Sequence, residues 1–355
     1  MRKSNFLYLL SLLIPPLFLS GCFITIKTSG GADGGVFKSL DGGETWEQKV
    51  LVYRLGELVE NFSTLDLTTM VMDPQDTQAI YLGTVEKGMY YTYNGGIGWQ
   101  QTLAGSGKIS AIAISPKETC IVYVAIGNRV YKSSDCNRHF EYKLIETRAD
   151  PNNIITALAV DPFNTQIVYA GTSGKGLFRS VDGGYSWQAI KFFEDQIAKV
   201  LIYPNNSQII YVATLSRGLF KSANAGADWW ALITPELAKQ YANLLVYRDL
   251  ILDPTKEDGL LYASQHGLLR SADGGTTWQN IKLLTPPSTT AIYSIAINPL
   301  NGKEIFYGIA TALYRSEDGG ENWITRDLPT SRTAKFLLIN PINPQILYLG
   351  TKRIK

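Results

Sequence analysis

The sequence is poor in the residues that build metal centres and cross-linked frameworks. Its 355 residues include two histidines and three cysteines, too few for a multi-histidine zinc site or a disulfide scaffold. Charged residues make up 18%, and the formal net charge is +2. A net charge so small gives no overall basic footprint for nucleic acid. We therefore expect no metal, no cofactor and no nucleic-acid partner.

Apolar residues, by contrast, are abundant. Hydrophobic side chains make up 45% of the sequence and aromatic side chains 11%. This is enough apolar surface for a large core, which excludes a disordered or collagen-like chain. The length would suit about two domains, although all-β folds of this size often form one unit.

The first 21 residues have the features of an export signal. Arg2 and Lys3 precede an apolar run that is shorter than the roughly 20 residues of a membrane-spanning helix. The sequence Leu-Ser-Gly-Cys follows and resembles the lipobox of bacterial lipoproteins, which implies lipidation of Cys22. We expect residues 1–21 to be a signal peptide and 22–33 a leash, with the protein anchored to a membrane and facing the periplasm or the cell exterior. An ordinary signal peptide or an uncleaved anchor stays open.

Seven copies of an eight-residue pattern, Ser-x-Asp-x-Gly-x-x-Trp, run through the chain. Its third position is occupied by Asp41, Asn94, Asp135, Asp182, Asn224, Asp273 and Asp318. Its last position is occupied by Trp46, Trp99, Phe140, Trp187, Trp229, Trp278 and Trp323, so the third copy is degenerate. A second pattern, an apolar segment ending in Pro followed by one that contains Tyr, alternates with the first and also recurs seven times.

Each repeat unit is typical of four short strands, rich in β-branched and aromatic residues and bounded by Gly, Pro and Asn. Seven such units at a spacing of about 45 residues predict an all-β, seven-bladed β-propeller of four-stranded antiparallel blades. The chain begins with the last two strands of a unit and finishes with the first two. We expect residues 34–355 to form one propeller, closed by a composite blade that the two ends build together.

The repeated pattern resembles the Asp-box, also called the bacterial neuraminidase repeat. The Asp is expected to accept backbone N–H bonds in the hairpin between strands three and four, the Gly to adopt positive φ, and the Trp to pack against neighbouring strands. These residues stabilise the fold, and no catalytic residue is assigned.

Two cysteines remain besides Cys22. Cys120 precedes the second strand of the unit that holds the third, degenerate copy of the pattern, and Cys136 follows its third strand. In an antiparallel pair these ends lie side by side, so we expect a Cys120–Cys136 disulfide, favoured by an exported location. Two free buried thiols are the alternative.

The loops between strands two and three are mostly basic. They form a candidate partner-binding face that holds Lys87, Lys175, Arg217, His266, Lys352 and Arg353. Binding sites concentrate in such loops; a solvated rim of cations is the alternative.

The resemblance extends to several functional classes. Sialidases share the boxes, but their Arg-Ile-Pro type motif is absent here and their propeller usually has six blades; sortilin-type receptors usually have ten. Xyloglucan-type glycosidases use seven-bladed propellers in pairs, with two catalytic carboxylates across a cleft, and we expect one propeller. Photosystem II assembly-factor propellers are similar in size, exported and often lipid-anchored.

We therefore expect a monomeric, lipid-anchored, non-catalytic scaffold that binds an envelope protein. The alternative is a glycan-binding or glycoside-hydrolysing propeller, which for hydrolysis needs two carboxylates at a suitable separation. The candidate carboxylates in the connections are Glu57, Glu60, Asp66, Glu194, Asp195 and Asp249. The candidate sugar-stacking aromatics are Trp230, Tyr53, Tyr142, Tyr241, Tyr247 and Tyr293.

Overall fold

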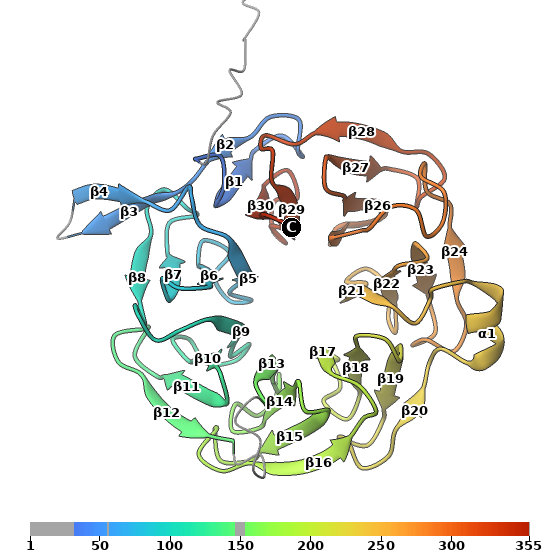
Figure 1. Cartoon of the computed structure of the whole chain (residues 1–355), viewed down its shortest axis with the longest axis horizontal. Helices are drawn as coiled ribbons and strands as arrows, with labels where there is room; N and C mark the ends of the chain where they lie inside the picture. Colours follow the sequence, from blue (N-terminus) through green and yellow to red (C-terminus); the bar gives the residue numbers. More distant parts are fainter. Residues whose placement is uncertain (1–31, 55–56, 146–152, 355) are drawn as a thin grey trace, which may run out of the picture.

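The computed structural model describes residues 32–54, 57–145 and 153–354 as a ring of seven four-stranded antiparallel sheets (Figure 1). The prediction of an all-β, seven-bladed propeller is confirmed. The expected signal peptide, Cys22 and nearly all of the expected leash lie outside the described residues. Within those residues, no helix has the length and apolar character that crossing a membrane requires.

Every blade uses its strands in the same order, from the channel outward. The inner strands are β5 (Leu67–Met72), β9 (Ile109–Ile114), β13 (Ile155–Val160), β17 (Ile197–Ile202), β21 (Tyr247–Leu252), β25 (Ser294–Asn298) and β29 (Thr333–Ile339). The second strands are β6 (Ile80–Thr84), β10 (Val122–Ile126), β14 (Val168–Thr172), β18 (Ile210–Thr214), β22 (Leu260–Ser264), β26 (Asn301–Gly308) and β30 (Leu347–Lys352). The third strands are β7 (Met89–Thr92), β11 (Arg129–Ser133), β15 (Gly176–Ser180), β19 (Leu219–Ser222), β23 (Leu268–Ser271), β27 (Ala312–Ser316) and β1 (Val36–Ser39). The outer strands are β8 (Gln100–Thr102), β12 (Glu141–Leu144), β16 (Gln188–Phe192), β20 (Trp230–Ala231), β24 (Gln279–Ile281), β28 (Ile324–Asp327) and β2 (Glu47–Gln48).

The second strands form the core because both of their faces pack against neighbouring blades. Every residue of β6, β10, β14, β18 and β22 is buried, which is why these strands are mostly apolar, with a single Thr or Ser at the end of four of them. The Tyr of some second strands also joins one blade to the next. The hydroxyl of Tyr123 donates to Gly183 O at 3.2 Å, and that of Tyr348 donates to Gly95 O at 3.3 Å. Such bonds satisfy a buried phenol, and they bring the two sequence patterns together at these interfaces between blades.

The two ends of the chain share one blade. Strand β30 lies between β1 and β29 and pairs antiparallel with both. Thr351 N donates to Gly35 O at 3.0 Å, beyond the last paired residues. The predicted composite blade is confirmed, and it leaves no gap between the first and last blades.

Two elements interrupt the repeat. A hairpin of β3 (Leu51–Arg54) and β4 (Glu57–Asn61) projects from the rim within a segment that we expected to be a plain connection (Figure 1). The helix α1 (Pro235–Gln240) begins at the N-cap Thr234, whose side chain accepts a bond from Leu237 N. We predicted no helix here, although a Thr cap followed by Pro at the first helical position is a start signal that the sequence contains.

The structure joins Cys120 and Cys136 in a disulfide with a Cα–Cα distance of 4.1 Å. The bond connects the turn before β10 to the turn after β11. It lies in the repeat whose last position is Phe140 instead of Trp.

Candidate functional site

The repeated turns use their acidic groups internally. Asp41 Oδ1 accepts bonds from Ser39 Oγ at 2.7 Å and from the backbone N–H of Glu44 at 3.1 Å and of Thr45 at 2.9 Å. Gly43 has φ +92° and donates its N–H to Ser39 Oγ at 2.8 Å. The residues equivalent to Asp41 in the other turns are Asn94, Asp135, Asp182, Asn224, Asp273 and Asp318, and each bonds its own turn in a similar way. These side chains hold hairpins together and do not face a ligand.

The carboxylates of these turns lead us to expect that the folded protein loses stability in acid. Burial alone would raise the pKa of Asp41, but hydrogen bonds from Thr45, Ser39 and Glu44 outweigh it and lower the pKa from 3.8 to about 2. The pKa of Asp182 is lowered to about 2 for the same reasons. A depressed folded-state pKa contributes stability above pH 3.8 that is lost as the pH falls towards 2.

Urea unfolding measured at several pH values between 5 and 2 should therefore show a steeper loss of stability for the wild type than for the double variant Asp41→Asn, Asp182→Asn. The variant Asp327→Asn, which changes an exposed carboxylate on β28, is the control and should keep the wild-type slope. Equal slopes for the wild type and the double variant would contradict the prediction.

The ring tryptophans are buried to different extents. Trp99 is fully buried, whereas Trp46, Trp187, Trp229, Trp278 and Trp323 are half-buried.

The candidate sugar-stacking aromatics also differ in their exposure and position. Trp230 and Tyr142 lie exposed on outer strands, and Tyr241 packs on His266. Tyr247 and Tyr293 lie in the channel.

The basic loop residues do not form one patch. Lys87, Lys175 and Arg217 are exposed on three different blades, and Arg217 is 3.7 Å from Glu194. His266 is buried against the ring of Tyr241, at a centroid distance of 4.8 Å. Its expected place on an exposed face was wrong, because the segment around α1 covers this loop. The remaining two members are Lys352, which is half-buried, and Arg353, which is exposed and bonded to Asp66.

A cavity of about 470 Å³ lies in the central channel and is lined by the inner strands of all seven blades. Its charged and aromatic part is formed by residues that lie just before the inner strands or among their first three positions. We call this part the channel mouth and define it by six residues. They are Lys199, Tyr247, Arg248, Asp249, Tyr293 and Lys335.

Two polar clusters meet at the channel mouth. Asp249 Oδ1 accepts bonds from Lys199 Nζ at 2.7 Å and from the Tyr247 hydroxyl at 3.3 Å. Burial, with the Asp249 charge, raises the pKa of Tyr247 well above its usual value, so this phenol is a donor at neutral pH. Lys335 lies 5.9 Å from the ring centre of Tyr293 and donates to its carbonyl at 3.4 Å. The channel mouth thus combines aromatic faces with charged donors and one carboxylate.

The other candidate carboxylates do not line this cavity. Glu60 is exposed on β4, and the side chain of Glu57 lies outside the described residues. Asp195 accepts a bond from Ser216 Oγ at 2.8 Å. In the described part of the chain, Asp249 is therefore the carboxylate that lines this cavity. No cluster of three or more potential metal ligands occurs in the same residues.

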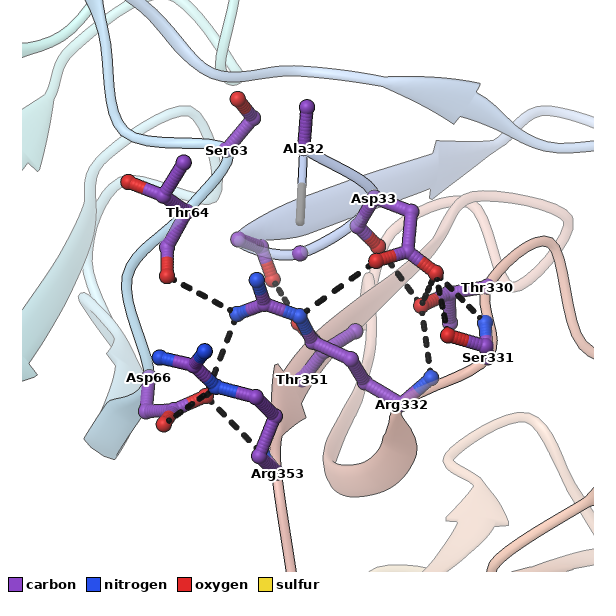
Figure 2. Close-up of polar contacts among 12 residues, drawn as sticks. Ala32, Asp33, Ser63, Thr64, Asp66, Thr330, Ser331, Arg332, Thr351 and Arg353 are labelled. Atoms are coloured by element: carbon purple, nitrogen blue, oxygen red, sulfur yellow. Dashed lines mark hydrogen bonds and ion pairs between the residues drawn. The ribbon is translucent and has the colours of Figure 1, made fainter. Parts of the chain in front are cut away.

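A buried arginine network closes the ring, and the repeat patterns did not predict it (Figure 2). The Arg332 side chain is 3% exposed, and its Nη1 donates to Asp66 Oδ1 at 3.1 Å and to Leu65 O at 2.9 Å. Asp33 lies 3.5 Å from Arg332 Nε and accepts a bond from Ser331 N at 2.7 Å. We expected Asp33 to belong to the leash; the structure packs it into the fold.

No known protein-family model matches the chain. The xyloglucanase Xgh74A of Acetivibrio thermocellus is 23% identical over 266 residues, which are 70% of this chain and 29% of that protein. The chain thus matches less than a third of the length of this relative.

Among solved structures, a GH74 xyloglucanase from Xanthomonas campestris superposes with a TM-score of 0.66 and 20% identity, over 81% of this chain and 51% of that one. YCF48 bound to D1 peptide gives a TM-score of 0.61 and 13% identity, over 81% of this chain and 94% of that one. The expectation of a non-catalytic protein-binding scaffold is corrected here, because the matched sequence relative is a xyloglucanase and the structural neighbours include a xyloglucanase and a further GH74 enzyme. At these identities the comparisons show the fold, a seven-bladed β-propeller that this chain shares with glycoside hydrolases.

Proposed function

We propose that the protein is a glycan-binding propeller of the glycoside-hydrolase type, which takes up polysaccharide at the channel mouth. The observation that carries the proposal is the 266-residue match to a xyloglucanase. That match covers most of the described ring, so it concerns the propeller as a whole and not a single repeat.

The channel mouth suits a sugar chain. Ligand pockets commonly have volumes of about 300–1,000 Å³ and combine apolar walls with a few placed polar groups. A cavity of about 470 Å³ falls in this range. Tyr293 offers a ring face to a pyranose, while Lys199 and Asp249 offer a donor and an acceptor to its hydroxyl groups.

Hydrolysis sets a further requirement. Cleavage of a glycosidic bond needs two carboxylates on either side of the scissile bond, and among the described residues the lining of this cavity supplies Asp249 alone. The resemblance to xyloglucan-type glycosidases implies one carboxylate from each of two propellers facing across a cleft. In our proposal Asp249 is the carboxylate of one such propeller, and a second propeller supplies its partner.

Two further assignments belong to the proposal. The seven repeated turns are Asp-boxes, which is supported by the bonds that Asp41 and its equivalents make to backbone N–H groups. The protein is exported and anchored through lipidated Cys22, so it meets glycans outside the cytoplasm. Mass spectrometry of the N-terminal peptide purified from membranes tests this anchor.

Glycan binding is tested by affinity gel electrophoresis of the purified chain in gels that contain xyloglucan or one of a set of neutral and acidic polysaccharides, together with an assay of released reducing ends. We expect retardation by at least one glycan. The variant Tyr293→Ala should lose it, because the ring face at the channel mouth is removed. The variant Tyr142→Ala, changed on an exposed outer strand, should retain it.

No retardation and no released ends with any polysaccharide would overturn the proposal. Equal losses in the Tyr293 and Tyr142 variants would place the site outside the channel and would also overturn it. Circular dichroism of each variant shows whether the ring is folded.

A further inference from the structure

The channel mouth carries more positive than negative charge. Lys199, Arg248 and Lys335 line the cavity together with Asp249, and Lys352 is close enough to act electrostatically on Lys335. Because the whole chain is nearly neutral, this excess is a local feature of one end of the channel. No blade repeat requires it, since the equivalent positions of other inner strands include Thr68, Ser110 and Thr156.

The excess charge is only partly neutralised within the protein. Asp249 pairs with Lys199 at 2.7 Å. Arg248 Nη2 donates to Gln265, but Arg248 Nε has no hydrogen-bond partner among the described residues. Lys335 Nζ reaches one acceptor, the carbonyl of Tyr293, at 3.4 Å.

Burial and the neighbouring charges also affect the pKa of Lys335. Burial lowers the pKa of Lys335; the Asp249 carboxylate opposes this, while the charges of Lys352, Lys199 and Arg248 add to it. A buried cation among other cations is costly unless an anion compensates it. An anion placed here would gain charge-assisted hydrogen bonds from several donors at once.

We infer that the channel mouth recognises an acidic glycan, with a carboxylate or sulfate group of the sugar held by Lys335, Arg248 and Lys199. This inference rests on the proposed glycan function and names its substrate class. The aromatic face of Tyr293 beside Lys335 lets one sugar residue stack while its acidic group meets the cations. A neutral glycan would bring no counter-charge to Lys335 and Arg248, and Lys199 would have only Asp249.

The test compares acidic polysaccharides with their own carboxyl-reduced forms, which keep the linkage and lose the charge. Calorimetric titration of the purified full chain with fragments of polygalacturonate and of alginate should show tighter binding for at least one acidic form than for its reduced form. The variant Lys335→Gln should weaken binding of the acidic form at least about tenfold, as the loss of a hydrogen bond to a charged group implies, and leave the reduced form unaffected. Lys335→Arg should retain most of the affinity.

Lys191→Gln is the matched control. Lys191 is exposed on outer strand β16, so its loss should not change affinity, which separates a local effect from a change in net charge. If an acidic glycan and its reduced form bind equally, or if xyloglucan binds more tightly than every acidic glycan, the inference fails while the proposed function stands. If no glycan binds, both fail. If poly-glutamate binds as tightly as the acidic glycan, the site recognises anions in general and the inference is overturned.

Discussion

Replacing Arg332 with methionine is expected to lower the free energy of unfolding by about 3–5 kcal/mol. Arg332 is 3% exposed and pairs with both Asp33 and Asp66. Methionine fills much of the volume but leaves two carboxylates without their counter-charge and the carbonyls of Thr64 and Leu65 without a donor. Removing one partner of a buried charge network costs more than the network itself contributes, because the remaining charges stay desolvated.

The effect is measured by urea unfolding at neutral pH, with Arg353→Met as the control. Arg353 also bonds Asp66, but its side chain is 62% exposed. Exposed ion pairs contribute about 0–1 kcal/mol, so this variant should remain close to the wild type. A loss in Arg332→Met no larger than that in Arg353→Met would show that the buried network does not hold the ring closed.

Replacing Trp99 with alanine is expected to lower the free energy of unfolding by about 3–5 kcal/mol. Trp99 is fully buried, its ring meets Phe62 edge-on at 5.5 Å, and its Nε1 donates to Lys49 O at 3.0 Å. Its backbone also joins the projecting hairpin, since Trp99 N donates to Leu51 O and Tyr53 N donates to Trp99 O. Alanine leaves a cavity and an unpaired carbonyl at the base of β3 and β4.

Thermal unfolding and amide hydrogen exchange together check this expectation. Trp230→Ala is the matched control, because Trp230 is 44% exposed on β20, and it should change the free energy of unfolding by less than about 1 kcal/mol. In Trp99→Ala the amides of β3 and β4 should exchange faster than those of the distant strand β16. Uniform exchange across the ring, or a loss equal to that of Trp230→Ala, would refute the assigned role.

The fold could be predicted because one pattern of short strands and turns repeats seven times, and each turn is held by bonds between residues close in sequence. Residues such as Asp41 form hydrogen bonds within their own turn, so the residues that make the pattern recognisable are also those that stabilise the turn. The composite blade followed from counting strands at the two ends. What the patterns did not show is which residues meet across the ring.

The arginine network is the clearest example. Arg332 and Asp66 are 266 residues apart and lie in connections that do not repeat. No periodicity links them, and their pairing depends on ring closure. His266 shows the converse: its loop belongs to a class that is exposed on other blades, but a non-repeating segment packs over it.

The channel mouth could be predicted only in part. Asp249, Tyr247 and Tyr293 were named as candidates among several others, whereas Lys199, Arg248 and Lys335 were not. These cations sit near the beginnings of inner strands, where periodicity distinguishes the two faces of a strand but not which face meets the ring axis. The convergence of seven strand ends on one axis is a property of the assembled ring.

The composite blade also determines how late in synthesis its strands can pair. Gly35 and Thr351, which bond within it, are 316 residues apart. A ribosome adds about 5–20 residues per second, so β1 and β2 are made about 15–60 s before β30 can pair with them. Until then β1, which pairs with β2 on one side, presents one unpaired backbone edge of the kind that promotes association between chains. The N-terminal strands thus need protection from such association until synthesis of the chain is nearly finished.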